Sequence, residues 1–131
     1  MPIFFDTATM PKADLRRFIA AIVTVPAGGT FEFPIVDAST LKPPTSTLAP
    51  TRTRLEGTRI VGTVFSNQSG TLQILQGSTT TNLDSVSSFN IDANTGFGYS
   101  VELVSPYIQI KLINTSTSTA TVRIFTYLRS I

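Results

Sequence analysis

The clearest alternation of apolar and polar residues lies in residues 59–77, where two short apolar runs flank a cluster of turn formers. The break between the runs, residues 66–70, reads SNQSG. β-Branched residues and period-two stretches around a glycine-containing break are typical of a β-hairpin. We therefore predict a hairpin whose strands carry Ile60, Val61, Val64, Phe65, Leu72, Ile74 and Leu75.

The same pattern continues to the end of the chain. Polar, turn-rich breaks separate further alternating stretches at residues 86–91, 99–104, 107–114 and 121–129. Turn signals about every 8–12 residues and a polar alternate face are typical of antiparallel sheets with one wet side. We predict an all-β fold, an antiparallel β-sandwich (jelly-roll-like) of about seven or eight strands with an extended N-terminal arm.

Residues 15–25 admit two interpretations. Leu15, Phe18, Ile19 and Ile22 follow helical spacing, with Asp14 in a capping position. The end of the stretch is β-branched, however, and a PAGG turn leads into an alternating stretch at residues 30–36. We favour a hairpin of residues 18–25 with 30–36 over a helix. Because proline cannot donate to a ladder, Pro34 predicts an edge strand.

Two segments lack this periodicity. We divide the chain into an N-terminal arm, residues 1–17, and a single β-sandwich domain, residues 18–131, with an irregular proline-rich segment at 38–57. The apolar residues of the arm either plug the domain's own core or dock on a neighbouring subunit. The proline-rich segment is either a surface crossover between sheets or an extended strip lying across a partner.

Composition excludes several kinds of chemistry. The 131 residues include neither histidine nor cysteine, which rules out Ser–His and Cys–His nucleophiles and the usual zinc sites. Ten cations against eight anions give a net charge of only +2, too little for a nucleic-acid footprint. No apolar run approaches the ~20 residues of a membrane span, and the N-terminus does not resemble a secretory signal.

The remaining candidate groups form no recognisable site. The eight carboxylates make no close pair in the sequence, and the D-x-N-x-G run at residues 92–96 lacks the spaced glutamate of a calcium loop. We interpret that run as a glycine-rich turn. We expect no catalytic, cofactor-binding or metal-binding residues, no small-molecule substrate and no enzyme activity. Arg16, Arg17, Arg52, Arg54 and Arg59 are predicted to be solvated or to contact acidic groups of another protein.

Several motifs in residues 59–130 suggest a family. They are residues 65–72 (FSNQSGTL), 88–89 (SF), 106–108 (PYI) and 126–129 (TYLR). In these positions the chain resembles small β-sandwich virion proteins of tailed bacteriophages. It departs from them at residues 77–83, where the family has a "DGTNW"-like turn, which leaves no support for a ligand role of that loop.

The resemblance implies a non-enzymatic capsid decoration (cement) protein, a homotrimer located in the virion and assembled in the host cytoplasm. Its expected partners are other copies of itself and the major capsid protein or another virion protein. We place the expected partner interface in the arm and the proline-rich segment, at Ile3, Phe4, Phe5, Arg16, Arg17, Pro43, Pro44, Arg52 and Arg54.

A second interpretation is a receptor- or glycan-binding module of a phage fibre or cell-surface protein. Carbohydrate-binding modules usually present an exposed aromatic platform. The chain has no tryptophan, and Phe97, in a glycine-rich loop, is the aromatic residue expected to be exposed.

Overall fold

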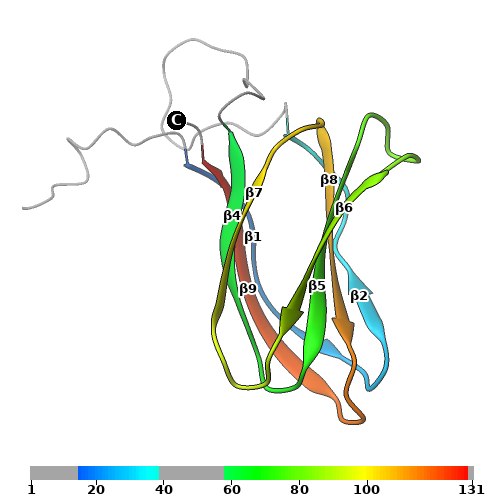
Figure 1. Cartoon of the computed structure of the whole chain (residues 1–131), viewed down its shortest axis with the longest axis vertical. Helices are drawn as coiled ribbons and strands as arrows, with labels where there is room; N and C mark the ends of the chain where they lie inside the picture. Colours follow the sequence, from blue (N-terminus) through cyan, green and yellow to red (C-terminus); the bar gives the residue numbers. More distant parts are fainter. Residues whose placement is uncertain (1–14, 39–57, 130–131) are drawn as a thin grey trace, which may run out of the picture.

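The chain folds as a two-layer antiparallel β-sandwich, which confirms the predicted fold class (Figure 1). The computed structural model describes residues 15–38 and 58–129. Within them lie nine strands: β1 (Leu15–Val25), β2 (Thr30–Glu32), β3 (Val36–Asp37), β4 (Arg59–Ser66), β5 (Gly70–Gly77), β6 (Ser85–Ile91), β7 (Phe97–Glu102), β8 (Tyr107–Asn114) and β9 (Ala120–Arg129).

The strands divide between two sheets. Sheet A has the order β1-β9-β4-β7, and sheet B has the order β2-β8-β5-β6, with β3 also pairing with β8. Apart from β2–β3 and the β5–β6 hairpin, each connection between consecutive described strands passes from one sheet to the other. This alternation is the arrangement of a jelly roll. The sequence pattern predicted a jelly-roll-like sandwich and left its strand order open.

The predicted hairpin at residues 59–77 is wrong in its pairing, although both strands exist. β4 lies in sheet A, where it pairs with β7 and β9, and β5 lies in sheet B, where it pairs with β6 and β8. Residues 67–69 therefore join strands that face each other across the core. The alternation of apolar and polar residues specifies which side of a strand is buried. The same side is buried whether the next strand pairs with it in one sheet or faces it across the core, so the pattern does not distinguish the two arrangements.

The prediction for residues 15–36 is half right for the same reason. The stretch forms strands and not a helix, but β1 pairs with β9 while β2 pairs with β8. The PAGG turn, closed by the Gly29 N–H donating to the Pro26 carbonyl at 2.8 Å, crosses between the sheets. β1 begins at Leu15, so the predicted arm of residues 1–17 overlaps this strand.

The edge position of Pro34 is confirmed. It lies between β2 and β3, and both of these short strands pair only with β8. The Phe33 N–H still donates to the Ile110 carbonyl at 3.0 Å. Pro34 interrupts the edge strand between β2 and β3 because it has no N–H to donate. Such a missing donor is tolerated on the free edge of a sheet.

The core lies between the two sheets and follows the alternation in the sequence. Ile108, Ile110 and Leu112 of β8 are buried, and so are Val122, Ile124 and Leu128 of β9. Phe89, Phe97 and Tyr99 pack together at the β6–β7 side, with ring centroids 5.6–6.5 Å apart. Aromatic pairs at this spacing add to the burial of the rings themselves.

Four inter-sheet turns lie at one end of the sandwich, drawn at the bottom of Figure 1. Asn114 joins two of them, since its buried side-chain amide donates to the carbonyls of Val25, Pro26 and Ser118 at 3.1, 3.1 and 2.7 Å. The Asn94 N–H donates to the Ser66 carbonyl at 2.7 Å, which connects the other two turns. These bonds satisfy polar groups that the crossings would otherwise leave unpaired.

Candidate functional site

The outward side of sheet A carries large apolar side chains where a solvated sheet face would carry polar ones. On β9, the alternation that buries Val122 and Ile124 turns Phe125 outward, with 39% of its surface exposed. On β1, Ile22 is 70% exposed. Exposed large apolar groups that lie together are unusual on a monomer surface and mark contact sites.

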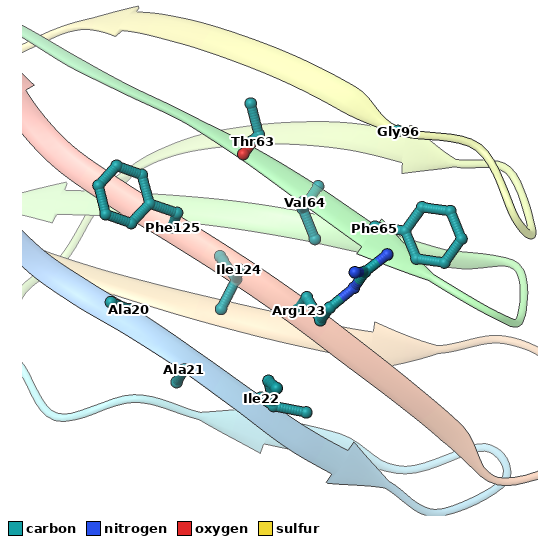
Figure 2. Close-up of a pocket in the computed structure, with 10 residues that line it drawn as sticks. All are labelled: Ala20, Ala21, Ile22, Thr63, Val64, Phe65, Gly96, Arg123, Ile124 and Phe125. Atoms are coloured by element: carbon teal, nitrogen blue, oxygen red, sulfur yellow. The ribbon is translucent and has the colours of Figure 1, made fainter.

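The strand register gathers these side chains into two rows. Ile22, Arg123 and Phe65 lie opposite one another on β1, β9 and β4. Ala20, Phe125 and Thr63 form the next row. The six side chains are among those that line an open groove of about 700 Å³. Figure 2 shows how they lie on the three strands. We call this surface the sheet A face: Ala20, Ile22, Thr63, Phe65, Arg123 and Phe125.

Arg123 is the charged group of the sheet A face. Its guanidinium carbon lies 4.6 Å from the centre of the Phe65 ring, within the range of a cation–π interaction. No carboxylate in the described part of the chain forms an ion pair with it. The face therefore offers an apolar groove beside an arginine whose hydrogen-bond donors remain available for an anionic group.

Charge is distributed unequally between the sheets. Among the residues whose side chains are described, the strands of sheet A carry Arg59, Arg123 and Arg129 against one carboxylate, Glu102. Sheet B balances its charge locally, since Lys111 Nζ lies 3.4 Å from Glu32 Oε2 on its outer side. The two outer surfaces thus differ, one cationic with exposed aromatic and aliphatic groups and one close to neutral.

Tyr99 is the described ionisable group whose pKa clearly departs from its ordinary value. Burial raises the pKa of its phenol to about 12, against a smaller opposing effect of the hydrogen bond with Thr126. Its ring crosses Gly62, where β4 has no side chain, to reach Thr126 on β9. Because the phenol stays protonated over the physiological range, Tyr99 serves packing and hydrogen bonding between strands.

No group of three or more His, Cys, Asp or Glu side chains lies together in residues 15–38 and 58–129. No helix in these ranges is long and apolar enough to cross a membrane. The D-x-N-x-G run forms a turn in which Asn94 has a φ of 58°. That agrees with its interpretation as a turn, because asparagine tolerates this left-handed conformation.

Only two of the nine expected interface residues, Arg16 and Arg17, lie among the residues that the structure describes. Ile3, Phe4, Phe5, Pro43, Pro44, Arg52 and Arg54 lie outside the described residues. Arg16 and Arg17 lie in β1, opposite Leu128 and Tyr127 of β9. Arg59 lies opposite Arg129, and donates from Nε to Ser100 Oγ at 2.6 Å. The register thus brings three of the five predicted arginines to one end of sheet A.

The expectation that Phe97 is an exposed aromatic residue in a loop is wrong. Phe97 begins β7, is partly buried and packs on the core beside Phe89 and Tyr99. The flanking glycines, Gly96 and Gly98, predict a loop, yet Gly98 lies within the strand. The glycan-binding interpretation therefore loses the aromatic residue on which it depended.

The sheet A face itself is absent from the expected interface. A signal for it was present in residues 121–129, where Phe125 occupies a position of the outward set together with Arg123 and Arg129. An aromatic residue in a polar register is the pattern that would have indicated a contact surface.

Comparisons with known proteins give a family and little more. A family model described as the uncharacterised protein YqxG N-terminal domain matches residues 45–127, more than half of the 131 residues. A search of curated proteins finds no match. Among solved structures, the chain is similar to one from Bacillus endospore appendages, reported as a novel family of disulfide-linked pili. The identity is 10% and the TM-score 0.39, over 87% of this chain and 92% of that one, and this likeness supports no functional assignment.

Proposed function

We propose that this chain, which belongs to the family of the uncharacterised protein YqxG N-terminal domain, is a non-enzymatic structural protein that works by surface contact with other protein subunits. The observation that carries the proposal is the sheet A face. There Ile22 and Phe125 are exposed beside Arg123, which forms no ion pair with a carboxylate of residues 15–38 or 58–129. Apolar anchors with an adjacent arginine are the composition of protein–protein contact sites.

The chemistry of the described residues favours binding over turnover. Tyr99, whose pKa is raised to about 12, is buried and stays protonated, and its phenol is engaged in a hydrogen bond with Thr126. The groove on sheet A is lined by aliphatic, aromatic and backbone groups, with Arg123 as its ionisable member. A surface of this kind recognises a complementary protein segment and offers no acid–base pair.

At a finer level, we propose a capsid decoration protein that binds and stabilises a phage head shell as a homotrimer. Two things support this: the motifs shared with small virion proteins of tailed phages, and the jelly-roll strand order, which is common in capsid proteins. The fold-level support is analogy, because one fold hosts many functions. The shared motif at residues 65–72 spans the turn between β4 and β5 and so belongs to the scaffold.

Co-sedimentation tests this proposal. The full chain is mixed with purified head shells of the phage or prophage that encodes it, and its molar mass is measured by light scattering. We expect a mass near three times 14.1 kDa in solution and saturable binding to the shells. A monomer that stays in the supernatant would contradict the proposal. Turnover that depends on one Asp or Glu would overturn its non-enzymatic part.

A further inference from the structure

The sheet A face is poorly suited to pack against the same face of a second copy. Such an isologous contact would bring both copies of Arg123 into one patch, and the six residues of the face include no carboxylate to pair with them. Because like charges brought together in a contact are unfavourable, the face requires an occupant that is apolar and carries a carboxylate.

A segment with that composition precedes β1. Residues 3–6 read IFFD, three large apolar side chains followed directly by Asp6. The other segment outside the described residues, 39–57, carries Lys42, Arg52 and Arg54 against Glu56. Its net positive charge makes it the poorer match for a face whose charged group is Arg123.

The direction of β1 determines whose face this segment meets. β1 runs from Leu15 toward the groove, and Ile22 lies near the end where the inter-sheet turns gather (Figure 1). The chain that precedes Leu15 therefore departs from the opposite end of sheet A. Residues 6–15 span at most about 30 Å when extended. Reaching the groove of its own sheet would require a complete reversal before Leu15.

We infer that Ile3, Phe4 and Phe5 of a second copy of this chain dock in the groove of the sheet A face, with Asp6 of that copy beside Arg123. The inference rests on the proposed function and names the contact through which the copies assemble. Each copy then donates one segment and receives another. This is a heterologous contact, which closes into a ring when the rotation between copies permits it. A ring of three copies agrees with the proposed homotrimer.

Complementation between two half-defective variants tests the inference. One variant lacks residues 1–12 and keeps the face; the other carries Phe125→Glu and keeps the segment. Val86→Glu is the matched control, since Val86 is 50% exposed on β6 of the other sheet. Molar mass is measured by light scattering for each variant alone and for an equimolar mixture, with circular dichroism reporting the fold.

We expect the full chain and Val86→Glu to assemble and each half-defective variant to be monomeric. The mixture should give a 1:1 complex, because only the segment of one and the face of the other can combine. Ile22→Glu, at a position more exposed than Phe125, should replace Phe125→Glu if that variant misfolds. Arg123→Glu should weaken assembly, and adding Asp6→Arg should restore it.

The outcomes separate this inference from the proposed function. Assembly of the full chain with no complex in the mixture would overturn the inference and leave the proposed function standing. A monomeric full chain that begins to associate when residues 1–12 are removed would mean that the segment covers its own face, which also overturns it. A full chain that is monomeric and does not bind head shells would overturn both the inference and the proposed function.

Discussion

Gly62 on β4 is a residue whose identity the packing dictates. A Cβ at this position would lie 2.1 Å from the Phe125 carbonyl oxygen and 2.6 Å from Tyr99 Oη. The missing side chain is what lets the Tyr99 ring cross the strand and hydrogen-bond with Thr126. A single glycine in the middle of a strand thereby links β7 to β9 on the inner side of sheet A.

Gly62→Ala should therefore destabilise the fold by about 2 kcal/mol or more, the cost of overpacking against backbone. Gly96→Ala is the matched control, because a Cβ there would have no atom within 4 Å. Urea denaturation of the two variants measures the difference in the free energy of unfolding. Equal midpoints would show that the crossing at Gly62 adapts freely.

The Tyr99 phenol predicts a loss of stability at high pH. Its pKa is raised to about 12 in the folded chain, while the unfolded value is 10.0. Below pH 10 the phenol is protonated in both states. Between pH 10 and 12 only the unfolded state releases the proton, so the free energy of unfolding falls with rising pH. The full effect of two pH units is about 2–3 kcal/mol.

Tyr99→Phe should flatten the pH dependence between pH 10 and 12 relative to the wild type, since it removes the titrating group. Thermal unfolding at intervals across this range measures the effect. Identical slopes for the two proteins would contradict the assignment of this stability change to Tyr99.

Among the elements, the inter-sheet turns depend on side chains that bond to backbone. Asn114 follows the last inward-facing apolar residue of β8 and holds the β1–β2 and β8–β9 connections together. On the opposite side of the same end, Asn67 Oδ1 accepts from the Thr121 N–H at 2.9 Å. The two asparagines act differently, one as a buried donor and the other as an exposed acceptor.

Asn114→Asp should cost about 3 kcal/mol or more, because it places a buried carboxylate against three carbonyl oxygens. Asn67→Asp should be nearly neutral, since an aspartate oxygen accepts the same hydrogen bond. The midpoint of thermal unfolding at pH 7 distinguishes the two substitutions. Comparable losses at both positions would contradict the donor role of Asn114.

The strands could be located from the sequence, whereas their pairing could not. The alternation of residues 107–114 and 121–129 places the buried side chains of β8 and β9 correctly. The same alternation in residues 59–77 predicts a hairpin, but β4 and β5 face each other across the core. A short turn can connect two paired strands or two strands that face each other. Which of the two forms depends on strands such as β9, which lies about 60 residues further along the chain and pairs with β4.

The candidate site was harder to predict because it exists only in the register of three strands. Ile22, Arg123 and Phe65 are far apart in the sequence and lie in one row across β1, β9 and β4. Each of them alone is an ordinary strand residue. Their shared outward position depends on pairings that the sequence pattern leaves open.

At the scale of the whole molecule, the two outer surfaces differ in composition and in charge. On sheet B, Lys111 and Glu32 form an ion pair. On sheet A, Arg123 lies over the Phe65 ring beside exposed apolar groups. A protein with one such surface can associate in a defined orientation, which a structural subunit requires. In the docking that we propose, Ile3, Phe4 and Phe5 of one copy contact the sheet A face of another.

The most direct test of this account is the molar mass of three proteins in solution, measured by light scattering at matched concentrations. The account predicts that the full chain and Val86→Glu have a mass near three times 14.1 kDa, and that Phe125→Glu has a mass near 14.1 kDa with an unchanged fold. An oligomer that persists in Phe125→Glu, or a monomeric full chain, would contradict the role of the sheet A face.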